Sequence, residues 1–487
     1  MSSARRGGAT FPQAAHVELR NTQLRRNLGH ATRTIRAKRA AVVDELDNWQ
    51  QLREAGAAIK RDVMANLDTY LVEFERAATE AGATVHWAPD ADAANDLIAG
   101  IVAGHGEHEV VKVKSLTTDE IGLNDALAAR GVEALENDFA ALILQLDGDW
   151  SSHILVPAIH SNRTEIRDLL RGTIGPADLS DDPAALAEAA RIHLRERFLR
   201  ARVGISGANF AIAETGTLVV LESEGNGRMC TTLPEVLISV VGIEKLLPRF
   251  EHLAVFMQLL PRSSTGERMN PYTSMWTGSA EGQDFHLVLL DNGRTNVLAD
   301  EVGRQALRCI RCSACLNVCP VYERAGGHAY GSVYPGPIGA ILTPQLRGIA
   351  RGPVDAQTAS LPFASSLCGA CFDVCPVRID IPEVLIHLRG QVARQSEATA
   401  RLPSGEALTM RAAAWTFRSP RRLSLVERAA GLFARIVTRR GRIGRLRGPG
   451  PIGAWFGARD LQAPARESFR AWWRRTDGGR PGDGDGS

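Results

Sequence analysis

The chain has 487 residues, a hydrophobic fraction of 44%, a charged fraction of 23% and a formal net charge of +2. This length indicates about three domains, and the composition is that of a globular protein, which excludes disorder of the whole chain. The net charge hides an asymmetry: residues 1–40 carry +8, residues 401–475 carry +13 and residues 476–487 carry −2, so that residues 41–400 carry −17.

The N-terminal segment contains the pair Arg5-Arg6, which could belong to an export signal. Charged residues, among them Glu18 and Arg20, follow where such a signal needs an apolar segment, so we expect no signal peptide. No run of about 18 uninterrupted apolar residues is present, and we expect no transmembrane helix. These features predict a cytoplasmic protein, in a reducing compartment where clustered cysteines bind metal more often than they pair with one another.

Apolar residues at three- and four-residue spacing predict helix over residues 41–80. Beyond residue 84, strands alternate with helices, a pattern typical of a mainly parallel sheet with crossover helices. The predicted helices are 91–103 and 119–130. The predicted strands, some of the later ones antiparallel, are 84–87, 109–113, 132–135, 153–156, 203–206, 211–212, 217–221, 236–241 and 285–290. The domain is expected to end near the turn dipeptide Asn292-Gly293.

Closely spaced glycines distinguish residues 204–227 of this domain. Gly204, Gly207 and Gly216 would allow the backbone to approach a ligand, and Glu214 could bind a hydroxyl group or a proton. Tight turns in a compact sheet, with a hydrogen-bonded carboxylate, account for the same pattern equally well, because glycine patterns by themselves are weak indicators.

Seven of the eight cysteines lie within residues 309–375, a crowding that argues against a disulfide framework. The first group, Cys309, Cys312, Cys315 and Cys319 followed by Pro320, has the C-x2-C-x2-C-x3-C-P spacing of bacterial two-cluster ferredoxins. In that spacing three thiolates hold one iron–sulfur cluster, and the fourth points to a second cluster.

The second cysteine group is Cys368, Cys371 and Cys375 followed by Pro376, or C-x2-C-x3-C-P. Aligned with the first motif, it carries Ser365 where Cys309 stands. The crossed ligation of two-cluster ferredoxins then assigns Cys309, Cys312, Cys315 and Cys375 to cluster one, and Cys319, Cys368 and Cys371 to cluster two. We expect two [4Fe-4S] clusters, the second with a fourth ligand from Ser365, water or another residue, or else a [3Fe-4S] cluster.

Zinc binding and burial without metal fit these cysteines less well. Paired C-x2-C elements also bind zinc, but the two C-x3-C-P endings are typical of ferredoxins. Seven core thiols at fixed spacing have no packing rationale. Cys230 is distant in sequence, and we interpret it as an inert buried thiol. Glycine and proline pairs between residues 326 and 344 exclude one long helix between the two motifs.

Beyond residue 396 the chain is rich in arginine. An amphipathic helix is predicted from Val426, Ala430, Phe433 and Val437, an aromatic anchor from Phe469, Trp472 and Trp473, and a frayed tail over 478–487. Because both basic ends also carry apolar residues, we expect them to dock on the acidic body or on an acidic partner. An anionic membrane surface and nucleic acid are the alternatives, and no DNA-reading motif is present.

Beyond the cysteine motifs, several strings of this sequence are similar to the lactate-utilisation protein B family, the iron–sulfur subunits of a bacterial L-lactate oxidation system. The resemblance extends over nearly the whole chain from about residue 17. The strings are residues 113–116, 120–124, 152–154, 157–160, 204–217, 231–234, 242–245, 260–263, 290–294, 327–331, 334–339, 450–455 and 468–472.

The resemblance implies a fold and a division of the chain. It implies an α/β domain with a Rossmann-like sheet akin to the NagB and CoA-transferase-like fold, followed by a mainly α-helical two-cluster ferredoxin domain. The expected parts are an N-terminal helical segment (1–80), an α/β LUD-type domain (81–298), a 4Fe-4S ferredoxin-type domain (299–395) and a basic C-terminal helical extension with a tail (396–487).

The resemblance also implies an activity and partners. The partners are a cysteine-rich subunit similar to heterodisulfide-reductase components and a small protein with a LUD domain; together the three proteins oxidise L-lactate to pyruvate. The chain is then the electron-transfer component of an oxidoreductase. No Gly-rich dinucleotide fingerprint follows the first predicted strand, so NAD or FAD is disfavoured.

The resemblance does not identify the residues that touch the substrate. His153, His160 and Glu214 are candidates for proton transfer, and Lys112, Lys114 and Arg228 are candidates for holding a carboxylate. A hydrogen-bonded structural role is the simpler interpretation of each histidine. Two further functions stay open: electron transfer from another 2-hydroxy acid such as glycolate, and a regulatory protein that senses a metabolite and redox state.

Overall fold

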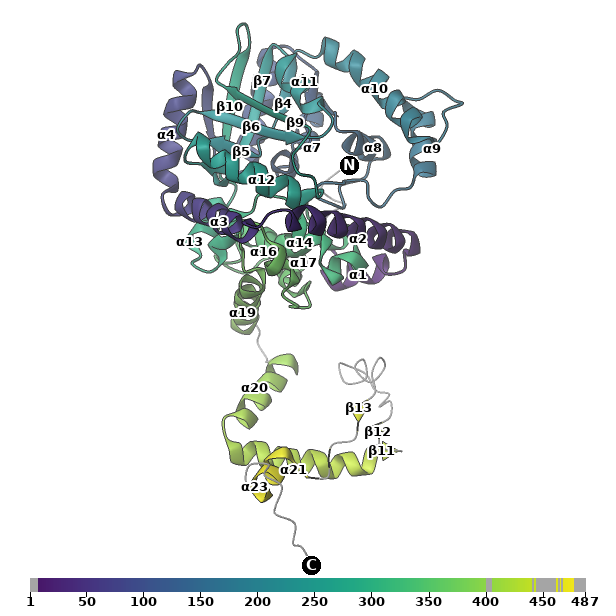
Figure 1. Cartoon of the computed structure of the whole chain (residues 1–487), viewed down its shortest axis with the longest axis vertical. Helices are drawn as coiled ribbons and strands as arrows, with labels where there is room; N and C mark the ends of the chain where they lie inside the picture. Colours follow the sequence, from purple (N-terminus) through teal and green to yellow (C-terminus); the bar gives the residue numbers. More distant parts are fainter. Residues whose placement is uncertain are drawn as a thin grey trace, which may run out of the picture. The chain divides into compact units, whose positions relative to one another are not determined.

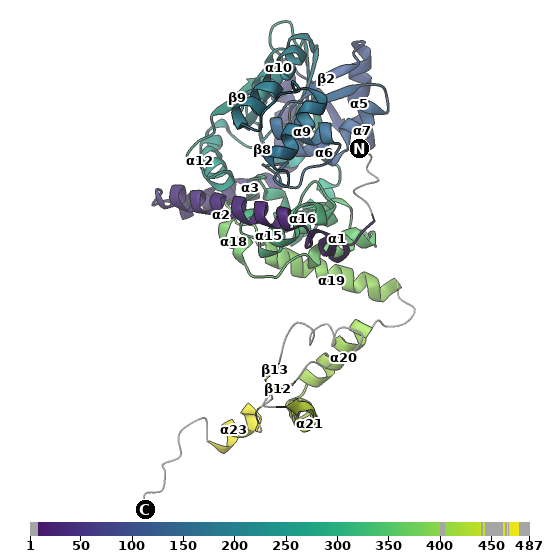
Figure 2. The ribbon, with the colours of Figure 1, turned by 90° about the vertical axis from the view of Figure 1, so that its right-hand side faces the viewer.

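The computed structural model of the chain describes residues 8–399, 405–439, 442–443, 461–462, 465 and 467–476. The chain divides into two compact units, Met1–Gln395 and Ser396–Ser487. Figures 1 and 2 show the helices and strands of both units. Within the described ranges, no helix combines the length and the apolar character that a membrane crossing requires.

A six-stranded sheet with only parallel neighbours forms the centre of the first unit. Its strands, in spatial order, are β1 (Thr84–Ala88), β10 (Asp284–Leu290), β7 (Val236–Gly242), β4 (Val203–Ser206), β2 (Glu109–Lys112) and β3 (Glu133–Glu136). Strands β4 and β7 are buried along their whole length, as expected of parallel strands that are covered on both faces. The predicted α/β class is confirmed.

Helices cover both faces of this sheet. Helices α5 (Ala91–Gly104) and α7 (Leu123–Ala128) pack on one face. Helices α8 (Phe139–Asp147), α10 (Pro183–Arg200) and α11 (Asn226–Thr232) pack on the opposite face. Helix α9 (Arg163–Thr173) extends this second layer through a small apolar cluster with α10.

Two predicted elements of this domain are wrong. Residues 153–156 form no strand, because the ring nitrogen Nδ1 of His153 accepts the backbone amides of Leu155 and Val156 and holds a turn. The helix predicted at 119–130 is divided into α6 (Leu116–Glu120) and α7, since Gly122 adopts the left-handed backbone conformation at φ 65°.

A second sheet contains the predicted strands 211–212 and 217–221, together with two strands, β8 (Leu246–Leu247) and β9 (Tyr272–Thr277), that were not predicted. Its order is β8, β5 (Phe210–Ile212), β6 (Thr217–Glu222) and β9. The pairs β5–β6 and β6–β9 are antiparallel, whereas β5 and β8 are parallel. Helix α12 (Leu253–Ser264) packs against this sheet through Phe256, which contacts Phe210.

The region 8–80 contains four helices: α1 (Phe11–Glu18), α2 (Thr22–Asp44), α3 (Trp49–Ala65) and α4 (Leu67–Glu80). Helices α2 and α3 contact α12 on one side and the cysteine-rich region on the other. Figures 1 and 2 show α2 and α3 running between the α/β sheet and the short helices of that region. These N-terminal helices therefore join the two parts of the first unit through a shared apolar core.

The cysteine-rich region is mainly helical, as predicted. Its α-helices are α13 (Arg294–Ala299), α14 (Ala314–Asn317), α15 (Pro320–Ala325), α16 (Gly336–Leu346), α17 (Ala356–Ser360), α18 (Ala370–Val374) and α19 (Ile381–Thr399). Between α15 and α16, the chain turns at Gly326 and Gly331, both of which have positive φ. One long helix between the motifs is therefore absent from this described stretch, in agreement with the glycine and proline content.

The second unit contains helices α20 (Gly405–Phe417), α21 (Pro420–Val437) and α23 (Phe469–Arg475), with the short strands β11 (Thr438–Arg439), β12 (Arg442–Ile443) and β13 (Leu461–Gln462). The predicted amphipathic helix corresponds to α21. The rings of Phe469, Trp472 and Trp473 contact one another in α23. The string 450–455 and the predicted tail 478–487 lie outside the described residues.

Candidate metal centre

The first cysteine motif begins in a loop, passes through the short helix α14 and ends at the start of helix α15. Arg311 and Ser313 adopt left-handed backbone conformations, at φ 60° and 58°, on either side of Cys312. Cys319 then caps α15, with Pro320 in the first turn, and the amide of Tyr322 donates to Cys319 Sγ at 3.4 Å. Proline fits this position because the first helical turn has backbone amides without intrahelical partners.

Four of the seven thiols lie around one small cavity: Cys309, Cys312 and Cys315 of the first motif and Cys375 of the second. Burial raises the pKa of each of Cys312, Cys315 and Cys375, and the neighbouring thiols raise these pKa values further. For Cys375 the pKa rises to about 11. Metal-free thiolates would repel one another here, and a bound cation would remove that cost.

The other three thiols, Cys319, Cys368 and Cys371, form a second group. Burial, together with the neighbouring Cys319 and Cys368, raises the pKa of Cys371 to about 12. Cys368 is exposed, whereas Cys319 and Cys371 are buried. Ser365 is half-buried, and its hydroxyl oxygen accepts the amide of Leu367 at 3.1 Å.

The donor set fits iron–sulfur ligation. All seven cysteines are free thiols. Backbone amides donate to three sulfurs: Arg311 N to Cys309 at 3.4 Å, Tyr322 N to Cys319, and Ile379 N to Cys375 at 3.3 Å. Hydrogen bonds to cluster thiolates, together with burial, are the means by which a protein sets a cluster potential.

Two arginines from the N-terminal helices support the second motif. Arg53 of α3 donates from Nε to the carbonyl oxygen of Cys375 at 3.0 Å and from Nη2 to that of Phe372 at 3.2 Å. Arg39 of α2 donates to the carbonyl oxygen of Val374 at 3.1 Å. Burial lowers the pKa of both guanidinium groups, while the charges of nearby cysteines act in the opposite direction. Two positive charges thus lie beside the four-thiol cavity.

A buried charge network connects the cysteine loop with the α/β domain. Glu244 accepts hydrogen bonds from Arg294 Nε at 2.5 Å and from Arg311 Nη2 at 3.1 Å. Burial alone would raise the pKa of Glu244, but Arg294 and Arg311 outweigh burial and lower it to about 2. Glu120 binds the other side of Arg294 at 2.9 Å and accepts the hydroxyl of Tyr334 at 2.5 Å.

Of the predicted proton-transfer residues, His153 is buried next to the cysteine motif. Its Nε2 lies 3.2 Å from Asn317 Oδ1, between Cys315 and Cys319 in the sequence, and its Nδ1 accepts two backbone amides. Burial lowers the pKa of His153 to about 4, so the ring is neutral near pH 7. With both nitrogens engaged, His153 links the turn 153–156 to the cysteine loop.

His160 lies in a separate polar cavity with Asp149 and His328. Its Nδ1 is 2.7 Å from Ser152 Oγ, and its Nε2 is 3.1 Å from Asp149 Oδ2. Glu214 shares no hydrogen bond with either histidine among the described residues. It is exposed and accepts the amide of Phe250 at 3.0 Å. The structure therefore does not bring the three candidates into one site.

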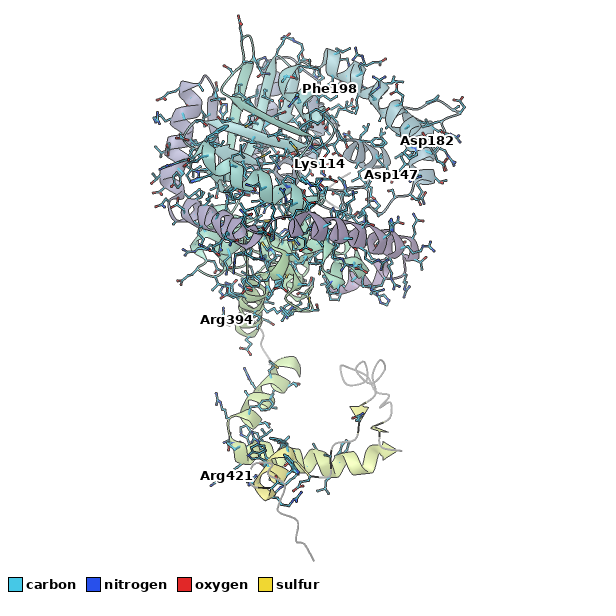
Figure 3. The ribbon with its side chains drawn as sticks, in the orientation of Figure 1. Lys114, Asp147, Asp182, Phe198, Arg394 and Arg421 are labelled. Atoms are coloured by element: carbon cyan, nitrogen blue, oxygen red, sulfur yellow. The ribbon has the colours of Figure 1, made fainter. Side chains whose placement is uncertain are left out.

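The three predicted carboxylate-binding cations also differ in surroundings. Lys112 is fully buried and bound to Glu136, with Nζ 2.7 Å from Oε1. Arg228 is exposed over the ring of Tyr272. Lys114, labelled in Figure 3, lines two cavities and donates to the carbonyl oxygen of Leu155 at 3.0 Å. Cys230 is fully buried against Val111 O, with its pKa raised by burial to about 12.

Sequence reasoning missed the residues that surround the metal centre. Arg311 lies inside the first motif, where the cysteine spacing draws attention only to the thiols. Arg39 and Arg53 look like ordinary polar positions of amphipathic helices. No sequence pattern marks Arg39 or Arg53, because their contacts with the cysteine region span more than 300 residues.

Comparison with protein families accounts for most of the chain. The LUD domain family matches residues 71–297, and the 4Fe-4S dicluster domain family matches residues 305–379. The family described as lactate utilisation protein B, C-terminal, matches residues 388–477.

Several curated proteins are similar over their full length. Lactate utilization protein B of Oceanobacillus iheyensis is 39% identical, covering 99% of this chain and 100% of that protein. The protein of the same name from Geobacillus sp. is 40% identical, covering 96% of this chain and 97% of that protein. A solved structure of a DUF162 family protein from Deinococcus radiodurans matches 46% of this chain and 98% of its own, at 14% identity and a TM-score of 0.26, which is too low to establish a shared fold.

Proposed function

The chain belongs to the lactate utilisation protein B family, and we propose that it is the iron–sulfur electron-transfer subunit of a multi-protein complex that oxidises L-lactate to pyruvate. The observation that carries this function is the arrangement of the seven free thiols, four of them around one cavity and three in a second group, inside a 4Fe-4S dicluster domain. The same arrangement supports two clusters rather than one.

The proposed ligands follow the two thiol groups. Cys309, Cys312, Cys315 and Cys375 would hold cluster one; Cys319, Cys368 and Cys371 would hold cluster two, with Ser365 as the nearest equivalent of a fourth cysteine in the motif alignment. Oxidation of a 2-hydroxy acid to a 2-oxo acid releases two electrons and two protons. When bound, each cluster carries one electron at a time, so two adjacent clusters provide a relay for the pair.

The remaining parts of the proposal concern the fold and the partners. We propose a NagB or CoA-transferase-like fold for the α/β domain, on the basis of its all-parallel central sheet. We propose the domain boundaries expected from the sequence, which lie at 80/81, 298/299 and 395/396. The proposed partners are a cysteine-rich heterodisulfide-reductase-like subunit and a small LUD-domain protein. The basic second unit, with exposed Trp415 and Trp473, is a candidate surface for an acidic partner.

The test is lactate-dependent dye reduction by the three co-purified proteins, prepared without oxygen. Cys312→Ala and Cys371→Ala should each abolish turnover and lower the iron content, since each removes a ligand of one cluster. Cys230→Ala is the matched control, because this buried thiol lies outside both groups, and its iron content should equal that of the unmodified protein. Full turnover in Cys312→Ala, or about four irons in total per chain, would refute the two-cluster relay.

Steady-state rates with glycolate and L-lactate distinguish the proposed substrate from another 2-hydroxy acid. A regulatory role is tested by a DNA gel shift at increasing salt, since binding to phosphates weakens steeply as salt rises. We expect faster turnover with L-lactate and no DNA complex.

A further inference from the structure

The central sheet has a topological switch point between strands β2 and β4. From β2 the chain continues to β3 through α7 on one face, whereas from β4 it continues towards β7 through α11 on the opposite face. In open parallel sheets, ligands bind in the crevice at the carboxyl ends of the two strands that flank such a point. The strand order therefore predicts where a ligand of this domain should bind.

A cavity of about 260 Å³ lies at this position. The loop after β2 contributes Val113, Lys114 and Ser115 to its wall, and the loop after β4 contributes Gly207 and Asn209. The two loops touch closely: a Cβ atom at Gly207 would lie 2.4 Å from Ser115 Oγ. A side chain at this position would force Ser115 to shift, which gives one of the glycines noted in the sequence a physical reason.

Lys245 and Arg311 line this cavity close to one another and form its cationic end. Lys114 also lines the cavity, but near the carboxylates of Asp138 and Glu224. Lys245 is only 9% exposed, and its ammonium makes no hydrogen bond or ion pair within the part of the chain that the structure describes. Nη1 of Arg311 is also buried without a hydrogen-bond partner among the described residues. A buried donor such as Nη1 of Arg311 is costly unless a ligand satisfies it.

The same cavity offers an unsatisfied acceptor. Asn270 contributes to the wall, and its Oδ1 is buried with no hydrogen-bond partner in the described ranges. Two cationic donors and one neutral acceptor match a small molecule with a carboxylate and a hydroxyl group.

Two acidic side chains of the cavity lining already accept backbone amides. Glu222 accepts the amides of Gly227 and Arg228 at 2.6 and 2.7 Å, and Glu224 accepts the amide of Phe139 at 3.3 Å. A substrate carboxylate is therefore directed to the cationic end.

That cationic end is adjacent to the four-thiol cavity. Arg311 and Ile154 line both cavities. Arg311 lies between Cys309 and Cys312 in the sequence, and its backbone amide donates to Cys309 Sγ. A molecule bound to Lys245 and Arg311 would thus lie beside two side chains, Arg311 and Ile154, that also line the four-thiol cavity.

We propose that this cavity binds the 2-hydroxycarboxylate substrate, with its carboxylate on Lys245 and Arg311 and its hydroxyl group on Asn270. The inference rests on the proposed function and adds the substrate position to it. Lys245 and Asn270 are then binding residues, and Arg311 connects the substrate with the proposed cluster one.

The experiment is calorimetric titration of L-lactate into the full-length, iron-loaded chain under anaerobic conditions. We expect saturable binding, with a Kd at least about tenfold higher in Lys245→Met, because a buried charge-assisted contact is lost. Lys38→Met, the same change at an exposed lysine, should leave the Kd unchanged. Asn270→Ala, at a half-buried position, should weaken the binding of L-lactate more than the binding of propionate, which lacks the hydroxyl group.

Iron content and reduction by dithionite, measured on the same samples, distinguish this inference from the proposed function. Intact iron and reduction, combined with no L-lactate binding, would overturn the inference alone. An unchanged Kd in Lys245→Met, or equally tight binding of sulfate, would also overturn it, since sulfate has no 2-hydroxy acid chemistry. Loss of iron–sulfur signals in a chain that still binds L-lactate would overturn the relay and leave the substrate cavity standing.

Discussion

Glu244 of the α/β domain and Arg311 of the first cysteine motif form a buried ion pair, with Arg311 Nη2 3.1 Å from Glu244 Oε1. The carboxylate is 1% exposed and the guanidinium 7%. Because Glu244 also binds Arg294, the pair fixes the cysteine loop against the end of strand β7. The metal centre and the sheet are therefore coupled through charge as well as through packing.

Glu244→Gln should destabilise the protein strongly. The substitution leaves Arg294 and Arg311 buried with one fewer carboxylate, and breaking a buried pair in this way costs about 3–5 kcal/mol. Urea unfolding followed by circular dichroism measures the change in free energy of unfolding. Glu45→Gln, which removes the exposed partner of Arg268, is the control and should have little effect. Equal effects of the two substitutions would contradict the importance of the buried network.

Arg53→Met should lower the reduction potential of cluster one. Arg53 holds a positive charge against the carbonyl oxygen of Cys375, and a cluster gains negative charge when it is reduced, so loss of the cation disfavours the reduced state. A redox titration followed by electron paramagnetic resonance measures the shift. Arg76→Met on helix α4, where Arg76 pairs with Glu80 at the surface, should leave the potential unchanged. A higher potential in Arg53→Met would contradict the prediction.

Ser365→Cys should make cluster two more resistant to air. The substitution restores the cysteine that the first motif has at Cys309, and a fourth thiolate would hold the cluster more firmly. The rate of bleaching of the iron–sulfur absorbance in air is the measurement, and we expect slower bleaching. Ser366→Cys moves the new thiol by one residue and serves as control. If both variants bleach at the rate of the unmodified protein, Ser365 does not occupy the fourth-ligand position.

His153→Asn should reduce the acid sensitivity of folding. The folded-state pKa of about 4 lies below the ordinary value of 6.5, so the unfolded chain binds more protons between these values and stability falls as the pH decreases. The loss attributable to His153 is roughly 1 kcal/mol between about pH 7.5 and about pH 5.5. Urea unfolding at both pH values should show a smaller difference in the Asn variant, whose side-chain oxygen can still accept an amide. An equal difference in both proteins would show that His153 does not titrate on unfolding.

The cysteine spacing and the α/β alternation could be predicted from the sequence because both are local patterns. All the predicted strands except 153–156 agree with observed ones within about two residues, since most of these strands are largely buried and read as short apolar runs. The strand predicted at 153–156 failed because a side-chain ring, and not a neighbouring strand, binds its amides. The helix predicted at 119–130 failed because Gly122 takes a left-handed conformation that periodicity does not register.

By itself, the sequence determined the class of the metal centre, since thiolates spaced by two and three residues can wrap a cluster whatever surrounds them. The tertiary structure alone decided what lies next to those thiols. Arg53, Lys245 and Arg311 come from three distant segments, and the fold brings Arg53 and Arg311 to the four-thiol cavity and Lys245 and Arg311 to the switch-point cavity. Such neighbours depend on strand order and helix packing, which are long-range properties that no local spacing encodes.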